Sequence, residues 1–233
     1  MIPYDVISDV GLVRENNEDS YAVKKIGDYT VLMVADGVGG LPYGEVASRT
    51  AIEAASDFLE KNLLAEEISN DEIAEVLKLL YNKVNADVVK QGLKLNSSAN
   101  GIVIGTTLTI CVVYKQQITV AHIGDSRAYL IHGSSIIKLT EDHVSDDDNH
   151  FLTKVIGDNS FLSPDIYRYS IMYGDLILLS TDGLHSVLSD NEIVVCLKKH
   201  KDLKGCLTNL VEAVYKKGAP DNVTIVLAHD KPE

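Results

Sequence analysis

The sequence predicts an α+β fold in which antiparallel sheet is flanked by helices. Strand-like segments follow one another in runs instead of alternating singly with helices, and helical segments come in blocks. No Pro-, Gly- or Ser-rich linker divides the 233 residues, and 45% of them are hydrophobic, which is ample for a buried core. We therefore expect residues 1–233 to form a single domain.

The first third of the chain predicts three strands and then two helices. The strand-like segments are YDVISDV, SYAVKKI and YTVLMVA, and the last is so uniformly apolar that it should be buried on both faces. From Glu45 to Leu64, apolar side chains recur every three or four residues, which indicates an amphipathic helix. A second helix begins near Asp71 and extends at least to Val88, and the small polar stretch 95–101 is expected to be a loop.

The rest of the chain predicts five strands, two helices and a last strand, and the fifth of these strands is DLILLST before Asp182. TTLTICVVY, QITVAHIG, SRAYLIH and SIIKL are separated by short polar or glycine-containing breaks, which suit antiparallel hairpins. Ser189 and Glu192 form an S-x-x-E capping box that should start a helix running through Leu197. Another helix from Leu203 is stopped before Pro220, and NVTIVLA closes the fold as a strand.

Composition narrows the classes of function. With 34 acidic and 21 basic residues, the net charge of −13 disfavours nucleic acid and anionic membranes and suits cations, although solubility alone would also explain it. The three cysteines lie far apart, so neither a disulfide framework nor a thiolate zinc site is indicated. There is no leader-like segment and no apolar run near the roughly 20 residues of a membrane span, so we expect a cytoplasmic protein.

Four aspartates fall at the ends of strand-like segments. Asp36, Asp125 and Asp182 each follow one, and Asp221 directly precedes the last. Strands fix their terminal side chains well, so these carboxylates can converge, and gathered anions are costly unless they share a proton or bind a cation. Oxygen donors suit Mg²⁺ or Mn²⁺. A single aspartate before glycine would simply indicate a turn, but four at strand ends favour a metal site.

Upstream residues add a group that could bind phosphate. Arg14 offers a planar fork of donors, and Glu18 and Asp19 add two acids. Gly37 has no side chain, so its carbonyl could approach a metal closely. An arginine among acids in a loop is commonly a solvated surface, but beside a carboxylate cage for metals it provides what phosphate-ester hydrolysis needs.

These motifs, in this order, resemble the PP2C (PPM) family of metal-dependent protein serine/threonine phosphatases in its bacterial or archaeal short form. The resemblance covers nearly the whole chain and rests on SDVGLVRENNEDSY, VADGVGG, GTTLTI, AHIGDSRAYL, LTEDH, LSTDGLHSVLSD and PDNVTIVLA. It implies a four-layer αββα sandwich, in which two antiparallel sheets are flanked by helices and a two-metal centre occupies a cleft at one end. It also implies hydrolysis of phosphoserine and phosphothreonine in proteins.

The resemblance implies roles for the residues that match its motifs. Asp36 would bridge two Mn²⁺ or Mg²⁺ ions, Asp182 and Asp221 would complete the first site, and the Gly37 carbonyl would join the second. A water or hydroxide bridging the ions would then attack phosphorus in line, without a phosphoenzyme.

Further roles concern the substrate and outer ligands. Glu18 and Asp19 would hold metal-bound waters, Arg14 would bind the substrate phosphate, and Asp125 would support the third ion that similar microbial enzymes carry. The expected partner is a phosphoprotein made by a serine/threonine kinase, with no nucleic acid and no membrane, and we expect a monomer.

The sequence departs from the family in three places. Val38 stands where many members have a histidine that is a candidate general acid, and His122, His143 and His185 give no basis for choosing a replacement. Only VSDDD separates His143 from NHFLTKVIGD, where relatives have a longer flap beside the substrate cleft, so the flap is nearly absent. Lys154 also replaces the family's usual arginine. The run Asp146, Asp147, Asp148 is best interpreted as a solvated loop.

Other functions fit less well. GDSRA approaches the G-x-S-x-G motif of serine hydrolases, but a strand-like segment follows where a helix is needed. GVGGLP has Pro42 in place of the third glycine of a dinucleotide-binding motif. A non-catalytic scaffold with this fold should lose metal-binding aspartates, which are retained here. A dedicated regulator of one phosphoprotein stays open alongside a broad phosphatase.

Overall fold

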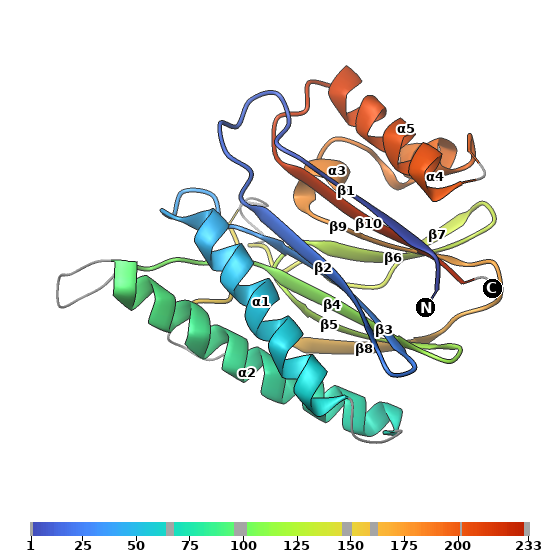
Figure 1. Cartoon of the computed structure of the whole chain (residues 1–233). Helices are drawn as coiled ribbons and strands as arrows, with labels where there is room; N and C mark the ends of the chain where they lie inside the picture. Colours follow the sequence, from blue (N-terminus) through green and yellow to red (C-terminus); the bar gives the residue numbers. More distant parts are fainter. Residues whose placement is uncertain are drawn as a thin grey trace.

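The fold is a sandwich of two five-stranded antiparallel sheets between two layers of helices (Figure 1). The computed structural model describes residues 2–63, 68–95, 102–145, 151–158, 163–200 and 202–230. Both sheets are built from hairpins and longer antiparallel connections, as the runs of strand-like segments predicted. The α+β class and the αββα layering are therefore confirmed.

The first sheet joins the two ends of the chain. Its order is β1 (Tyr4–Asp9), β10 (Val223–His229), β9 (Leu176–Ser180), β6 (Arg127–His132) and β7 (Ser135–Lys138). The second sheet has the order β2 (Asp19–Ile26), β3 (Tyr29–Asp36), β4 (Leu108–Tyr114), β5 (Gln117–Ile123) and β8 (Asp165–Ser170).

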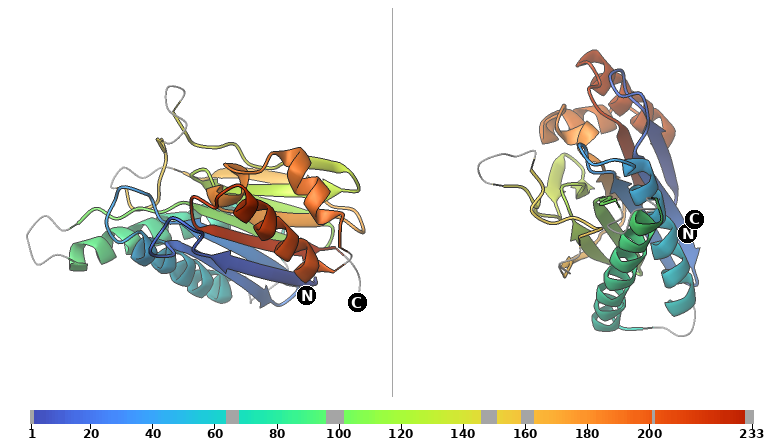
Figure 2. Two further views of the ribbon diagram at one scale, coloured as in Figure 1. Left: turned by 90° about the horizontal axis from the view of Figure 1, so that it is seen from above. Right: turned by 90° about the vertical axis from the view of Figure 1, so that its left-hand side faces the viewer.

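In the described part of the chain, five helices cover the outer faces of the sheets. Two long ones, α1 (Gly44–Asn62) and α2 (Asn70–Leu95), lie on the second sheet, and α3 (Asp182–His185), α4 (Asp190–Leu197) and α5 (Leu203–Lys216) lie on the first. Figure 2 shows the two helical layers on opposite sides of the paired sheets. None of the helices in the described ranges is long and apolar enough to cross a membrane.

Three separate apolar clusters hold the four layers together. One packs α1 and α2 against the second sheet, with Leu77 and Met33 at its centre, and another packs α3, α4 and α5 against the first sheet. The third lies between the sheets, where Leu32 and Val34 of β3 meet Leu179 and Val226. Strand β3 therefore contributes to clusters on both of its faces, which is why its sequence is uniformly apolar.

Most boundaries fall close to those expected from periodicity. Both arms of the Ser189–Glu192 capping box are formed at the start of α4, which ends at Leu197. Strand β8 was not expected, because it is an edge strand whose side chains are only half buried and carry no strong apolar alternation. The stretch 96–101 of the expected loop 95–101 lies outside the described residues.

Candidate active site

Antiparallel pairing brings the strand-end aspartates of the first sheet to one edge. Ser180 in β9 is paired with Ile225 of β10 on one side and with Arg127 of β6 on the other. Asp182 comes after the last residue of β9, Asp221 precedes β10 and Asp125 precedes β6. All three therefore lie at the same end of this sheet, where these strands begin or finish. In the second sheet, Asp19 and Asp36 are directly opposite each other across β2 and β3. The expected convergence is thus produced by strand register.

Hydrogen bonds fasten these ends of the two sheets to each other. The Thr181 hydroxyl donates to Asp19 Oδ2 at 2.8 Å, and the Asp36 amide donates to Thr107 Oγ1 at 2.9 Å. Thr107 Oγ1 lies 2.7 Å from Ser126 Oγ, beside the start of β6. The carboxylates are therefore held by buried cross-sheet contacts rather than by loops alone.

A cavity of about 690 Å³ lies at this end of the sandwich. Seven of the eight site residues expected from the sequence line it, and the eighth, Asp19, is buried beneath it beside Asp36. The seven are Arg14, Glu18, Asp36, Gly37, Asp125, Asp182 and Asp221. Five acids and one arginine therefore share a single concave site.

Burial among like charges alters the acidity of these carboxyl groups. Burial, and then the neighbouring Asp19, Asp182, Asp125 and Asp221, hold the pKa of Asp36 well above its usual range. Burial raises the pKa of Asp19 to about 7 and also that of Asp125 to about 7. Several carboxylates gathered in this way repel one another when all are ionised, and a bound cation would reduce that repulsion.

The donor set fits divalent metal ions. Asp19 Oδ1 is buried and has no hydrogen-bond partner, so it is an oxygen donor that the protein itself leaves unsatisfied. All the candidate ligands are oxygens, as Mg²⁺ and Mn²⁺ prefer. Within the described ranges no three His, Cys, Asp or Glu side chains are already spaced to hold one ion. Asp221 is paired with Arg14, whose Nη2 lies 2.7 Å from Asp221 Oδ2.

Asn222 is a site residue that the sequence patterns did not single out. Its side-chain amide donates to the carbonyls of Val10 and Asn16 at 2.9 Å each, and its Oδ1 accepts from the Glu18 amide at 2.8 Å. It thereby fixes the loop that carries Arg14 and Glu18 against the start of β10. The one sequence feature that could have pointed to Asn222 is its position between Asp221 and an otherwise apolar strand.

None of the three histidines from the family-like motifs lines the cavity. His122 and His143 are stacked in the interior with ring centroids 4.9 Å apart, and His143 is hydrogen-bonded to the Gly124 amide and to Asp165. His185 is half-buried at the end of α3, and burial lowers its pKa to about 3. The general acid therefore stays unassigned. The valine side chain at position 38 has no proton to donate, so it cannot take this role.

We expect acid to destabilise this protein partly through His122. Burial, and then His143, lower the pKa of His122 to about 3, well below its unfolded value near 6.5. The unfolded chain then binds more protons between pH 6.5 and 3, so stability falls as pH falls through that interval. In urea unfolding with EDTA, His122→Asn should show a smaller loss of midpoint between pH 7 and pH 4 than the wild type.

The exposed His200→Asn variant is the matched control and should follow the wild type. If the urea midpoint of His122→Asn fell as steeply between pH 7 and pH 4 as that of the wild type, this result would contradict a neutral, buried His122.

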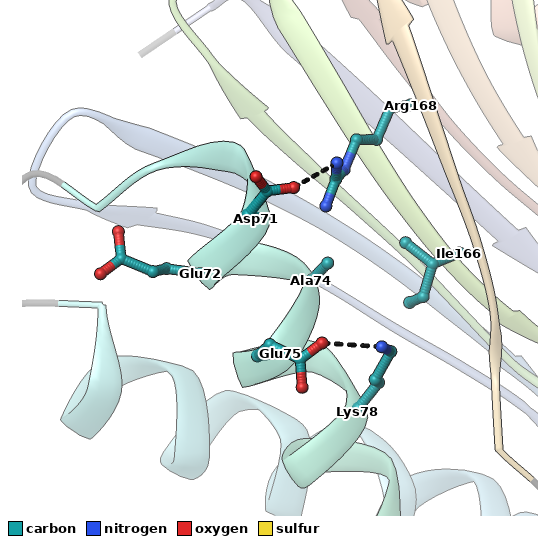
Figure 3. A pocket seen from close by; sticks show the side chains of 7 residues that line it. All are labelled: Asp71, Glu72, Ala74, Glu75, Lys78, Ile166 and Arg168. Atoms are coloured by element: carbon teal, nitrogen blue, oxygen red, sulfur yellow. Dashed lines mark hydrogen bonds and ion pairs between the residues drawn. The ribbon is translucent and has the colours of Figure 1, made fainter.

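A second cavity of about 640 Å³, between α2 and β8, has a different character (Figure 3). Four of its five charged side chains form ion pairs, Asp71 with Arg168 at 2.6 Å and Glu75 with Lys78 at 2.7 Å, and Glu72 is hydrogen-bonded to Ser69. It offers no group of convergent acids, so we do not assign it a function.

The structure also removes two alternatives. Ser126 of GDSRA is fully buried, bonded to Thr107 and followed by β6, so it is no nucleophile elbow. The GVGGLP loop leads into two successive helices on an antiparallel sheet, which is no βαβ unit. The run Asp146–Asp148 lies outside the described residues.

A four-layer sandwich with acids and an arginine gathered in a cavity at one end defines a metal-dependent phosphate-ester hydrolase. The chain belongs to the Protein phosphatase 2C family, whose sequence model matches residues 13–227. It is 31% identical over 246 residues to the serine/threonine phosphatase stp of Listeria welshimeri, covering 94% of this chain and 92% of that protein.

Solved structures agree with this assignment. Stp1 from Staphylococcus aureus has a TM-score of 0.87 at 27% identity, covering 100% of this chain and 96% of that one. The catalytic domain of the phosphatase PstP in complex with two manganese ions has a TM-score of 0.83 at 28% identity, covering 99% of each chain. The protein is therefore a protein serine/threonine phosphatase.

Proposed function

We propose that this phosphatase removes phosphate from phosphoserine and phosphothreonine in the products of a serine/threonine kinase, using two Mn²⁺ or Mg²⁺ ions. The observation that carries the proposal is the gathering of Asp36, Asp182, Asp221, Asp125 and Asp19 at one end of two sheets, where burial and the neighbouring carboxylates raise the pKa values of Asp36, Asp19 and Asp125. The manganese ions in the similar PstP domain support the choice of metal.

The ligand roles are those that the family resemblance implies. We assign Asp36, Asp182, Asp221 and the Gly37 carbonyl as direct ligands. Glu18 and Asp19 would act through water, and Asp125 would serve a third ion. When bound, the ions supply a hydroxide nucleophile at neutral pH and neutralise the phosphate oxygens.

Arg14 orients the substrate. Its guanidinium lies at the cavity mouth, about half exposed, and its planar donors match two phosphate oxygens. The ion pair with Asp221 keeps the Arg14 guanidinium beside one of the acids of the site, so a phosphate bound by Arg14 would lie next to them. Asn222 maintains this arrangement through its bonds to the Arg14 loop.

Hydrolysis of p-nitrophenyl phosphate and of a phosphothreonine peptide, with and without Mn²⁺, tests the proposal. The wild type should be active only with Mn²⁺ or Mg²⁺, and Asp182→Asn should lose most turnover because one anionic ligand is removed. Asp28→Asn, in the exposed turn between β2 and β3, is the control and should keep full activity. A wild type that is inert with both metals would favour a non-catalytic scaffold.

Residues 1–233 are proposed to act as one phosphatase domain, as a monomer and in the cytoplasm. The apolar cluster between the sheets supports a single domain, because it joins strands from both ends of the chain. The three cysteines are buried and unpaired, which agrees with a reducing compartment. Size-exclusion chromatography with light scattering measures the oligomeric state.

A further inference from the structure

The lining of the active-site cavity holds two kinds of residue. Besides Arg14 and the acids, five apolar residues line it: Val38, Leu41, Phe151, Leu152 and Val155. We call these five residues the apolar wall. None of them can ligate an ion or bind phosphate, so the catalytic site as described has no use for them.

The backbone of the apolar wall is fixed on both of its segments. The Phe151 carbonyl accepts from the Ser145 amide at 2.9 Å, and the Thr153 amide donates to the His143 carbonyl at 2.8 Å. On the other segment, the Val38 amide donates to the Gly105 carbonyl at 2.9 Å. The side chains of Val38 and Leu41 also pack on Gly105. The wall is therefore anchored to the same framework as the acids.

Phe151 is held in place without being part of the core. Its side chain is 68% exposed although its backbone is hydrogen-bonded, and it belongs to none of the three apolar clusters. An exposed aromatic side chain at the mouth of a cavity is a common feature of binding sites. In the sequence it comes three residues after VSDDD, the short stretch that stands where the family resemblance places a longer flap.

The volume of the cavity and the net charge of the protein indicate which part of a substrate would lie against the apolar wall. A volume of about 690 Å³ is that of a site for a ligand larger than a phosphate group. A substrate whose phosphate meets Arg14 must therefore place its neighbouring residues in the remaining space. An apolar wall offers no partner to a charged neighbour, and the net charge of −13 repels acidic ones.

We propose that the enzyme prefers protein segments in which a residue with a large apolar side chain comes directly before or after the phosphoserine or phosphothreonine. This apolar side chain lies against Phe151 on the apolar wall. This inference rests on the proposed function, since it takes the phosphate to be bound by Arg14. It deepens that function by naming the substrate class, and it gives the shortened flap region a role in selectivity.

The test compares phosphothreonine peptides that differ only at the positions flanking the phosphorylated residue. Leu, Gly or Glu is placed there, and the ratio of kcat/KM between peptides is measured for each variant with saturating Mn²⁺. For the wild type we expect a Leu-to-Gly ratio of about ten or more, as apolar pockets typically give. Phe151→Ala should bring the ratio close to one, and Phe151→Leu should largely restore it.

The ratio is taken within one variant, so a general change in activity cancels. Val195→Ala is the matched control, because Val195 is also a large exposed apolar residue but lies on α4, away from the cavity. It should retain the wild-type ratio.

Three results would overturn the proposal in distinguishable ways. A wild-type ratio near one, with metal-dependent hydrolysis of the Gly peptide intact, would reject the apolar wall but keep the proposed function. A wild-type preference that survives in Phe151→Ala would reject Phe151 as its source. Failure to hydrolyse any peptide with Mn²⁺ or Mg²⁺ would reject the proposed function itself.

Discussion

Asp36→Asn should abolish catalysis while making the metal-free protein more stable. Asp36 is the carboxylate proposed to bridge both ions, and losing several kcal/mol of charge stabilisation corresponds to a fall in kcat on the order of 10³ or more. In the metal-free protein the same carboxylate is buried among Asp19, Asp182, Asp125 and Asp221, so removing it relieves repulsion. Activity and stability should therefore change in opposite directions.

The stability gain should depend on pH. Burial raises the folded-state pKa of Asp36, so the folded protein binds more protons than the unfolded chain. Wild-type stability then falls as pH rises above the unfolded pKa near 4, whereas an asparagine at this position does not titrate. In EDTA, the difference in Tm between Asp36→Asn and the wild type should be larger at pH 8 than at pH 5.

Thermal unfolding with EDTA checks this prediction, and roughly 2–4 °C corresponds to 1 kcal/mol in a domain of this size. Asp57→Asn, on the exposed face of α1, is the control and should change neither Tm nor kcat. An Asp36→Asn protein that is less stable than the wild type in EDTA at pH 8 would show that Asp36 has a structural role.

Gly183→Ala should lose both stability and activity. A Cβ on Gly183 would lie 1.9 Å from the carbonyl oxygen of Asn222, which belongs to the backbone and cannot rotate away. Gly183 follows Asp182 and Asn222 follows Asp221, so the close approach of these two backbones is what brings the two aspartates together. We expect a loss of about 3 kcal/mol or more in the free energy of unfolding, together with the loss of metal-dependent turnover.

Urea unfolding and hydrolysis of p-nitrophenyl phosphate measure the two effects of Gly183→Ala. Gly39→Ala is the matched control for stability. The nearest atom to a Cβ on Gly39 is 3.9 Å away, in the Arg14 guanidinium, so that variant should fold as stably as the wild type. If Gly183→Ala were as stable as Gly39→Ala, the strands carrying Asp182 and Asp221 would have room to separate.

The glycines of the site show where local patterns give an incomplete answer. A glycine after aspartate reads as a turn, and Gly37 was expected to expose its carbonyl to a metal. In the structure a Cβ on Gly37 would lie 2.5 Å from the backbone of Gly44, so this glycine also permits the start of α1 to approach β3. Contacts of this kind join residues distant in the chain and have no local signature.

The histidines and Asn222 make the same point. A histidine in a family-like motif could be catalytic or structural, and only the folded structure shows that His122, His143 and His185 do not line the cavity. No sequence pattern gave Asn222, which follows Asp221, a role in the site, yet its side chain connects the start of β10 to the loop of Arg14. Its importance comes from three hydrogen bonds to residues more than 200 positions away.

The sequence by itself determined the elements and the residues of the site. Apolar periodicity is a local property, so it located α1, α2, α4, α5 and nine of the ten strands, and the ordered motifs indicated which acids matter. Tertiary structure decided how these residues meet. Strand register set Asp19 opposite Asp36, the pairing of β9 with β10 and β6 aligned Asp182 with Asp221 and Asp125, and the segment around Phe151 completed the cavity. The raised pKa values and the apolar wall arise only from that convergence, because they depend on distances between segments that the chain folds together.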